Sequence, residues 1–343
     1  IVAKAMAKGA NVDKLAAEFA DELDNLGVRV ANLEKKADNV KVTGELRYKY
    51  MSKKDDANDG QSFENDLRSR IWVTGQINDD WSYTGMIENT QDFYGESANK
   101  GDEDTSFARA YVEGKIGGLN VTAGRYNAFL ANGNIYDAKA DGVEVSYGDK
   151  VKVTGFAGKG TDAVDNASFG NYCGGELSGA FDNMNLAAGY VNFKDMGIKD
   201  VDTNVDNAIW YVGGDYTMGD VNLSAMYLKG DMSKADEDVS GIDDDGWTVG
   251  LTYKGAEASE AGSWGLFANY YDLGGMTYVA HTTDANSFGD YGVDNKGFKG
   301  YGVGANYTFA KNIVGTVVYY DTENKLNSKV DDQRVWADLT FTF

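Results

Sequence analysis

From Lys41 to the last residue, apolar and polar side chains alternate with a period of two. In the segment 335–343 every odd position is apolar, from Val335 to Phe343, while polar residues and Trp336 occupy the even positions. Such alternation predicts strands that have one apolar face and one polar face. The sequence contains no run of 18 or more apolar residues, so it predicts no transmembrane helix, and strands carry the fold.

Two kinds of connector separate the alternating segments, and short and long connectors alternate along the chain. The short connectors are Asn78–Asp80, Gly117–Gly118, Gly148–Lys150, Asp182–Met184, Met218–Asp220, Gly255–Gly262 and Ala310–Asn312. The long, polar connectors are Met51–Glu64, Asp92–Asp104, Ala128–Ala140, Gly160–Asn171, Asp195–Val205, Asp231–Asp244, Gly274–Lys296 and Glu323–Asp332. Seven short and eight long connectors join about 16 antiparallel strands, most of them about 9–13 residues long, the length with which a tilted strand crosses a bilayer. Short turns on one side and long loops on the other predict an all-β fold, a closed transmembrane β-barrel.

A soluble β-sandwich is the alternative fold for strands of this kind. A sandwich buries its apolar faces against a second sheet and uses strands of about 5–6 residues. The strands here are longer, and the face opposite the apolar one is rich in Gly, Thr, Asn and Arg. Aromatic residues also gather near the segment ends, as in the aromatic belts at the two surfaces of a membrane. These features favour a membrane barrel, formed by residues 41–343, and disfavour a soluble sandwich.

The first forty residues follow a different pattern. Apolar residues recur there every 3.5 positions on average, which is the period of a coiled-coil seam. The seam consists of Phe19, Leu23, Leu26, Val30, Leu33 and Ala37. We therefore expect a short α-helical coiled-coil stalk over residues 11–40, and its mixture of Leu and β-branched seam residues permits two or three helices. An amphipathic helix lying on another domain has similar spacing and remains the alternative.

Charge and composition exclude several functions. The chain carries 32 Lys and Arg against 54 Asp and Glu, a net charge of −22, so we expect no binding to nucleic acid. With one cysteine, Cys173, and one histidine, His281, neither an intrachain disulfide nor a CxxC or His-rich metal site is expected. His281 stands three residues from Asp284 in a long loop, which is a weak basis for catalysis. We expect no enzyme activity and no cofactor.

The chain resembles the bacterial general-diffusion porins. Its last residues, Leu339, Phe341 and Phe343 at alternating positions, are similar to the C-terminal signal that the barrel-assembly machinery reads. More narrowly, residues 11–43 followed by a first strand at Gly44–Tyr50 resemble the OmpM-like porins. That resemblance implies a homotrimer in the lipid of the bacterial outer membrane, with a periplasmic stalk that joins the barrel to a domain bound to peptidoglycan or its decorations. Residues 1–10 resemble the last helix of that S-layer-homology domain.

The resemblance implies passive diffusion of small hydrophilic solutes and ions through a water-filled barrel, and attachment of the outer membrane to the cell wall through the stalk. A barrel of 16–18 strands does enclose an aqueous channel. A mainly structural tether between outer membrane and peptidoglycan, with incidental conductance, is the alternative function.

Basic side chains gather on the first five strands and on the last strand, which become neighbours when the barrel closes. They are Arg47, Lys49, Arg68, Arg70, Arg109, Arg125 and Arg334. These arginines fall on the polar, lumen-facing phase, except for Arg125, which needs a bulge near Gly124 to turn inward. The pair Gly124-Arg125 nevertheless resembles the Gly-Arg that faces the pore in general porins. We expect these residues to form a basic wall along the lumen, because a guanidinium keeps its charge when it is crowded and partly desolvated.

The third long loop, 128–140, is the expected constriction, since the corresponding loop of general porins folds into the lumen opposite such a wall. The residues concerned are Asn132, Asn134, Tyr136 and Asp137 in the loop and Asp141 and Glu144 just after it. Opposed charges across a narrow aqueous gap create a transverse field that orients dipolar solutes, while the width limits their size. Alternatively the arginines pair with lumen carboxylates such as Glu45, Glu88 and Glu113 and stiffen the wall. The two roles can coexist.

Acidic runs gather in the long loops, the last of them at Asp243, Asp244 and Asp245. A calcium site there is one hypothesis, because Ca²⁺ takes several carboxylate oxygens. None of the runs has EF-hand spacing, so solvated loop charge is the alternative. An acidic rim enriches cations at the mouth of a channel over a screening length of about 8–10 Å. Ion selectivity is thus a contest between an acidic vestibule and a basic constriction.

Overall fold

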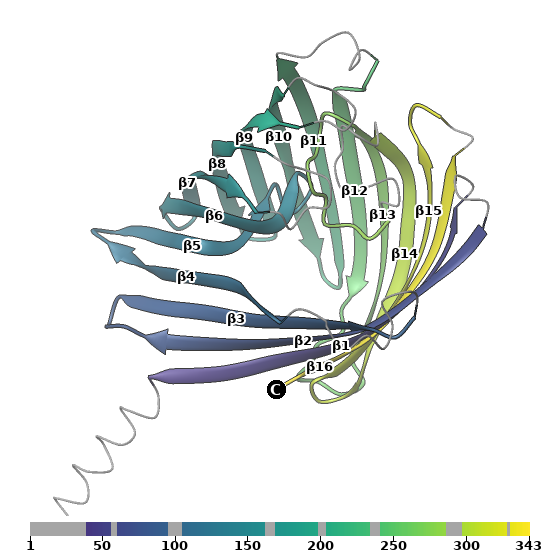
Figure 1. Ribbon diagram of the computed structural model, residues 1–343, viewed down its shortest axis with the longest axis horizontal. Coiled ribbons are helices and arrows are strands. Elements are labelled where there is room, and N and C mark those ends of the chain that lie inside the picture. The colour runs from purple at the N-terminus through teal and green to yellow at the C-terminus, as the bar shows by residue number, and fades with distance from the viewer. Residues whose placement is uncertain are drawn as a thin grey trace, which may run out of the picture.

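The computed structural model describes residues 39–55, 60–94, 105–161, 169–197, 204–233, 241–285, 297–327 and 330–343. Within these ranges the chain forms 16 β-strands that close into one barrel (Figure 1). In chain order they are β1 (Val40–Asp55), β2 (Gly60–Gln76), β3 (Trp81–Asp92), β4 (Ser106–Ile116), β5 (Leu119–Leu130), β6 (Tyr136–Tyr147), β7 (Val151–Gly160), β8 (Asn171–Phe181), β9 (Met184–Met196), β10 (Val205–Met218), β11 (Val221–Ser233), β12 (Asp245–Lys254), β13 (Trp264–Gly274), β14 (Gly297–Ala310), β15 (Ile313–Asn324) and β16 (Asp331–Thr342). Every strand pairs antiparallel with both of its neighbours, so the predicted all-β barrel of about 16 strands is confirmed. Among the described residues no helix is long and apolar enough to cross a membrane.

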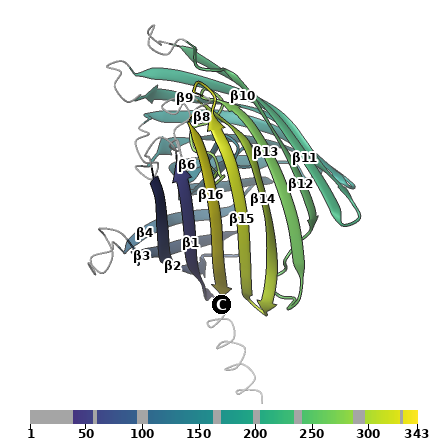
Figure 2. The ribbon, with the colours of Figure 1, turned by 90° about the vertical axis from the view of Figure 1, so that its right-hand side faces the viewer.

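The pairing of β1 with β16 closes the barrel. Its register runs from Glu45 opposite Thr342 to Asp55 opposite Asp332. Beyond that register the amide of Gly44 donates to the carbonyl of Phe343 at 2.8 Å, and the amide of Phe343 donates back to Gly44 at 3.0 Å. Figure 2 shows β16 beside β1, followed by β15 and β14. Closure leaves no open sheet edge, which is the condition under which strands can cross a bilayer.

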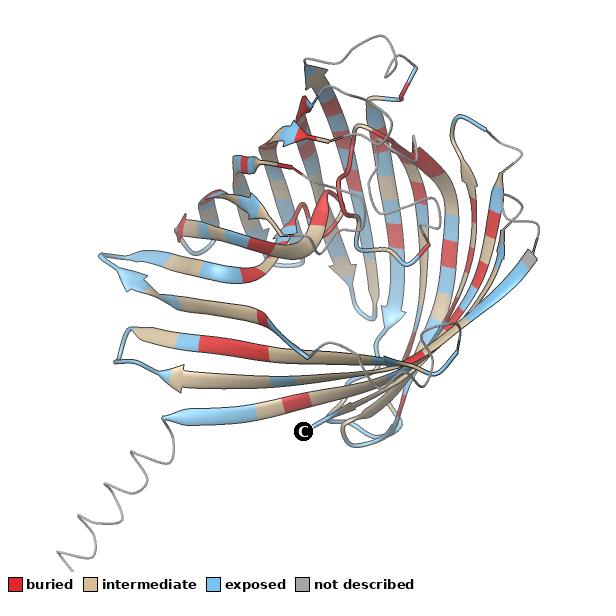
Figure 3. Cartoon of the chain, viewed as in Figure 1, coloured by how far each residue is buried: buried red, intermediate tan, exposed pale blue. Residues whose placement is uncertain are grey.

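The two faces of the sheet differ as the alternation predicts. On β12, Trp247, Val249 and Leu251 point outward and are 40–45% exposed, while Thr248 and Gly250 face the lumen. Figure 3 shows the bands of differing burial along the strands. Exposed apolar residues elsewhere on the outer face include Val151, Val153, Leu177, Leu186, Trp210, Val212, Leu223, Leu266, Val303 and Val317. An apolar exterior of this extent is suited to hydrocarbon.

Most connectors agree with the sequence, and two of the long ones differ from it. The seven short turns lie within a residue of their expected bounds; Gly148–Lys150, for example, joins β6 to β7. At the opposite end of the barrel six of the eight long connectors lie within three residues of their expected bounds, and the strands run substantially further than predicted only at 51–64 and 128–140. Most of the expected loop 51–64 is paired strand, with Lys53 opposite Ser62. Beyond the hydrocarbon both faces of a strand meet water, so backbone pairing continues where the alternation that marks a strand in the sequence has ended.

The predicted N-terminal elements lie almost entirely outside the described residues. This holds for residues 1–10, for the stalk at 11–40 and for all of its seam. The described chain begins at Asn39, and Val40, which the sequence assigns to the end of the stalk, is instead the first residue of β1.

The buried apolar side chains lie inside the barrel and mostly on one side of it. The cluster is built largely by residues between Tyr126 and Leu228, together with Tyr278, Val279 and Ala280 from the loop after β13. A sequence of alternating strands does not show this, because the residues concerned occupy the lumen phase or loops. One part of the lumen therefore contains an apolar core, and the remainder has polar walls.

We expect the short turn before β7 to depend on its glycine. Gly148 has φ +101°, and an added Cβ would meet the carbonyl oxygen of Val151 at 2.1 Å, so Gly148→Ala should lower the free energy of unfolding by about 1–3 kcal/mol. Gly155→Ala is the matched control, because a Cβ there meets nothing within 4 Å. Urea titration of the protein refolded in phospholipid vesicles measures both values. Equal stability of the two variants would contradict this account of the turn.

Candidate permeation pathway

The strands β5 and β6 leave the barrel wall part-way along their length. Pairing between β4 and β5 ends at Ala110 opposite Arg125, and pairing between β6 and β7 begins at Ala140 opposite Gly160. Between those points β5 and β6 pair with each other and with no other strand of the barrel wall, up to Leu130 opposite Tyr136. We call this two-stranded segment, Tyr126–Lys139, the inner hairpin.

The tip of the inner hairpin contacts the wall on the other side of the lumen. The hydroxyl of Thr248, on β12, donates to the side-chain oxygen of Asn134 at 3.2 Å. Asn132 lines a cavity together with Asp215 of β10 and Ser224 of β11. The hairpin therefore crosses the lumen. The predicted loop 128–140 is largely paired strand, and only Ala131–Ile135 lies between β5 and β6.

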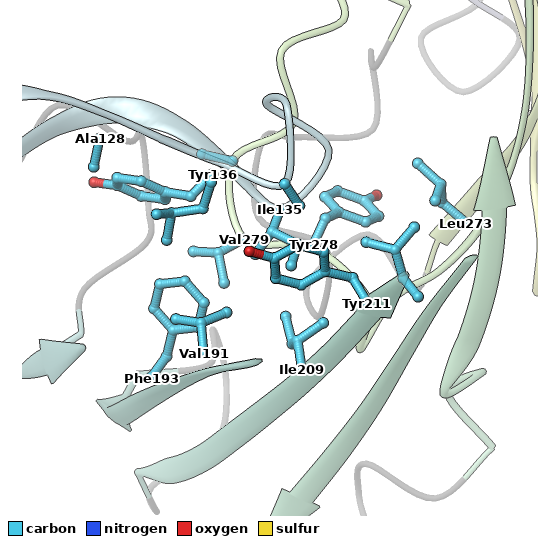
Figure 4. Packing of buried hydrophobic residues seen from close by; sticks show 14 of the residues in the cluster. Ala128, Ile135, Tyr136, Val191, Phe193, Ile209, Tyr211, Leu273, Tyr278 and Val279 are labelled. Carbon is cyan, nitrogen blue, oxygen red and sulfur yellow. The ribbon is translucent and has the colours of Figure 1, made fainter. Parts of the chain in front are cut away.

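Apolar packing holds the inner hairpin against the wall formed by β8–β10 (Figure 4). Ile135 and Tyr136 are completely buried. The ring of Tyr136 lies with its centroid 5.7 Å from that of Phe169 and 6.0 Å from that of Phe193. Burial of this kind stabilises by about 1.5–3 kcal/mol per large side chain. The hairpin is thus fixed by a hydrophobic core that lies within the barrel.

A second segment enters the lumen and pairs with the hairpin. It comprises Met276–Ala285, from the loop after β13, and we call it the lumen strap. Its residue Ala280 forms a parallel bridge with Tyr136. The carbonyl of Ile135 accepts the amides of Val279 at 2.9 Å and Ala280 at 3.0 Å. Sequence reasoning missed this segment, although the apolar run at 278–280 within a polar loop is a signal that could have found it.

The far end of the lumen strap is anchored by Arg334. This residue is buried, its Nε donates to Asp332 at 2.7 Å, and an Nη donates to the carbonyl of Asp284 at 2.6 Å. The hydroxyl of Thr322 donates to the carbonyl of Ala285 at 3.2 Å. Arg334, one of the residues predicted to form the basic wall, therefore anchors the lumen strap.

His281 is a structural part of the strap. Its ring lies edge-on to those of Tyr271, Tyr278 and Phe298, at centroid distances of 5.5, 6.0 and 6.1 Å. Its Nδ1 accepts the amide of Thr283 at 3.0 Å, which leaves the proton on Nε2, 3.2 Å from the side-chain oxygen of Asn134. Burial lowers the pKa of His281 to about 3, so the ring is neutral at pH 7.

Basic side chains do line one wall of the lumen. Arg47 and Arg68 are direct register partners on β1 and β2, and like charges placed opposite one another repel. Carboxylates offset part of this charge. The ion pairs are Arg68–Glu45 at 2.8 Å, Lys49–Asp66 at 2.6 Å, Lys49–Glu64 at 3.5 Å and Arg70–Glu88. The wall-stiffening role considered above therefore has its partners at Glu45 and Glu88. We use "basic wall" below for Arg47, Lys49, Arg68, Arg70 and Arg109.

Two members of this wall differ from the others. Among the described residues no carboxylate lies within ion-pair distance of Arg47 or Arg109. The guanidinium of Arg47 stacks 5.2 Å from the ring centroid of Trp336. That of Arg109 donates to the side-chain oxygen of Asn127, on the inner hairpin, at 3.0 Å. These two residues carry the charge that neighbouring carboxylates leave uncompensated.

Asp137 connects the basic wall, the inner hairpin and the lumen strap. One of its carboxylate oxygens accepts the amide of Asn127 at 2.6 Å, and the other accepts the hydroxyl of Thr282 at 2.6 Å. Since Asn127 also accepts from Arg109, a continuous chain of hydrogen bonds runs from β4 to the strap. Asn127 and Thr282 were not predicted, and nothing in the sequence marks them.

Arg125 lies apart from the basic wall. The pairing of β5 with both neighbours passes through Gly124 without a shift, so Arg125 keeps the phase of Val121 and Ala123. It forms two hydrogen bonds with Asp141, at 2.6 and 2.7 Å, and both side chains are exposed. The bulge that would turn Arg125 inward is thus missing from this part of β5. Asp141, which the sequence grouped with the constriction loop, therefore pairs with Arg125.

The remaining predicted residues have simpler settings. Glu144 is half-buried on β6 opposite Thr122. Asp243 and Asp244 form ion pairs with Lys325 at 2.9 Å and Lys229 at 2.8 Å. No group of three His, Cys, Asp or Glu suited to a metal occurs in the described parts of the chain, and the calcium hypothesis at Asp243–Asp245 stays a prediction. Leu339 and Phe341 lie on the outward-facing phase of β16, and Phe343 follows that strand. Cys173 is exposed on the outer face of β8.

Solved structures resemble this barrel over most of its length. OmpF of Salmonella typhi, in complex with daunomycin, shares 15% identity and a TM-score of 0.58 over 89% of this chain and 97% of its own. A loop-deletion mutant of OmpT, an outer membrane protein of Vibrio cholerae, shares 18% identity and a TM-score of 0.57 over 89% and 100%. A triple mutant of the Rhodopseudomonas blastica porin gives 16% and 0.57 over the same shares. The chain has the porin fold. No protein-family model and no curated protein sequence matches it.

The buried tip residue should determine how firmly this porin-fold hairpin is docked. Ile135→Ala removes a completely buried side chain and should weaken docking by about 2–4 kcal/mol, which corresponds to at least about thirtyfold faster exchange of the amides of Asp137 and Val279. Hydrogen exchange measured by mass spectrometry tests this. Phe129→Ala is the control, because Phe129 is 54% exposed on the other face of the hairpin. Unchanged protection in Ile135→Ala would show that the core does not hold the hairpin.

The single histidine allows a direct test of the strap. In the folded protein the imidazole NMR signals of His281 should titrate near pH 3, compared with about 6.5 for a solvated ring. Because the folded state binds this proton less readily, the stability of the docked strap is fully present above pH 6.5 and declines as the pH falls toward 3. Phe298→Ala admits water and should raise the pKa toward 6.5. A wild-type value near 6.5 would mean that the strap is not docked.

Proposed function

We propose that this chain is a bacterial outer-membrane porin, a passive diffusion channel for small hydrophilic solutes and ions. The observation that carries the proposal is the closed barrel of 16 strands, which has an apolar exterior and a lumen crossed by the inner hairpin. A barrel of this size is wide enough for an aqueous channel. The likeness to solved porins supports the same conclusion at the level of the fold.

Solutes pass, in this proposal, between the basic wall and the inner hairpin. Arg47 and Arg109 provide positive charge on one side, and Asp137 provides negative charge at the edge of the hairpin. A field across a narrow, partly desolvated gap orients dipolar solutes and ions, while the hairpin limits their size. The ion pairs of Arg68 and Arg70 make this field weaker than the number of arginines suggests.

Conductance in planar lipid bilayers tests the proposal. Purified protein should give stepwise, ohmic current, and its absence would end the channel hypothesis. Replacing Arg68 and Arg70 together by Ser should shift the reversal potential toward cation selectivity, because Glu45 and Glu88 then lose their counter-charges. Arg125→Ser is the matched control and should leave the reversal potential unchanged, since Arg125 pairs with Asp141 away from the basic wall.

We further propose that the N-terminal segment tethers the barrel, as a homotrimer, to the cell wall. The chain enters β1 at the end of the barrel that carries the short turns, beside the C-terminal strand that resembles an assembly signal. In outer-membrane barrels that end faces the periplasm, which supports a periplasmic stalk. The seam from Phe19 to Ala37 is the sequence evidence for the coiled coil.

Deletion of residues 1–39 separates the two roles. The truncated barrel should keep its conductance, because the described wall begins at Val40, while the outer membrane should detach from the peptidoglycan layer. Electron microscopy of the envelope and cosedimentation with purified peptidoglycan measure attachment. An envelope that stays attached would refute the tether for this segment, and cross-linking of the intact protein tests the trimer.

A further inference from the structure

A polar cavity of about 260 Å³ lies between the tip of the inner hairpin and the wall formed by β10–β13. It is separate from the passage proposed above, because the basic wall lies on the strands β1, β2 and β4. At about 30 Å³ per water molecule, the cavity has room for roughly eight waters. Its roof includes Asn132 and Asn134 of the hairpin tip and Thr282 of the strap.

The floor of this cavity is a row of register partners that crosses four strands. Asp215 of β10 lies opposite Ser224 of β11, Ser224 opposite Gly250 of β12, and Gly250 opposite Asn269 of β13. A Cβ added at Gly250 would meet Ser224 Oγ at 2.5 Å and Asn269 Oδ1 at 2.8 Å. The glycine therefore leaves a slot between two side chains that can donate and accept hydrogen bonds.

The polar groups around the slot have hydrogen-bonding capacity to spare. Among the described residues, the side chains of Asn132, Ser224 and Asn269 have no hydrogen-bond partner. Asp215 accepts two side-chain amides, those of Asn185 at 3.1 Å and Asn222 at 3.0 Å, and its carboxylate has further lone pairs. Polar groups that converge on a cavity without partners are satisfied by water or by a ligand.

The chemistry of the lining indicates the class of ligand. Asp215 is the one charged side chain that lines this cavity among the described residues, and the remaining polar groups are amides, hydroxyls and a neutral imidazole beside the ring of Tyr271. Neutral donors and acceptors next to an aromatic ring match a solute with several hydroxyl groups. We propose that this cavity binds an uncharged polyhydroxylated solute of about monosaccharide size. The inference rests on the proposed channel function and adds a solute class to it.

A polar route leads to the cavity from the end of the barrel that carries the short turns. A second cavity, of about 420 Å³, shares Asn132, Gly214 and Asp215 with the first. It extends to Lys150 in the turn before β7 and is also lined by Glu176. A solute can thus reach the slot without passing the aromatic core that holds the hairpin.

Saturation-transfer NMR with D-glucose tests binding independently of conductance. Wild-type protein in detergent micelles should transfer saturation to the sugar. In Gly250→Ala the new methyl group fills the slot, and affinity should fall about tenfold, equivalent to losing one or two hydrogen bonds. Gly155→Ala, where a Cβ meets nothing within 4 Å, should bind like the wild type. Asn132→Ala, which removes one partner without filling the slot, should weaken binding as well.

Two further measurements make the outcome unambiguous. D-glucuronate should bind more weakly than glucose because its carboxylate faces Asp215, and tighter binding of glucuronate would overturn the uncharged class. Gly250→Ala should conduct ions like the wild type, because the basic wall lies elsewhere. If wild-type protein conducts ions but transfers no saturation to glucose, the binding site is refuted and the channel function is not. If it transfers saturation but conducts no ions, the channel function is refuted and the binding site is not. Equal transfer to Gly250→Ala and wild type refutes the slot.

Discussion

The hydrogen bonds between β1 and β16 are the contacts on which the rest of this structure depends. In hydrocarbon, each backbone N–H and C=O group without a partner costs several kcal/mol, so a sheet that is apolar outside must have no free edge. Once the first and last strands pair, the polar phase of all 16 strands turns inward together. Arg47, on β1, then lies next to Trp336, on β16, although 289 positions separate them in the chain, the difference between their residue numbers.

Closure alone would give a wide tube, and the interior core makes it narrower on one side. Ile135 and Tyr136 of the inner hairpin are buried in this core beside β8–β10, and Tyr278 of the lumen strap is buried against Phe298 of β14. Apolar burial and charge are thereby segregated within one lumen. The basic wall lies on the strands away from this core, where guanidinium groups remain charged even when they are partly desolvated.

The sequence predicts those parts of the molecule in which a periodic pattern reports a physical environment. Strands between lipid and water alternate, so their number and the short turns such as Gly148–Lys150 were predictable. The lumen strap was missed because its one signal, the apolar run at 278–280, is too short to have a period and gives no hint of its partner, Ile135, which lies in another loop. The alternation of apolar and polar positions placed Arg47, Arg68, Arg70 and Arg109 on the polar face of their strands. It could not show which of these arginines have carboxylate partners. That depends on cross-strand register, which a single sequence does not specify.

The bridge between Tyr136 and Ala280 has a consequence for the order of assembly. The two residues stand 144 positions apart, the difference between their numbers, and contacts between distant parts of a chain form slowly because a large loop must first be ordered. The strap also needs Arg334, on the last strand, to hold its end. The end of the lumen strap can therefore reach its final position only after the last strand has been added, whereas the inner hairpin packs against β8–β10, which come earlier in the chain.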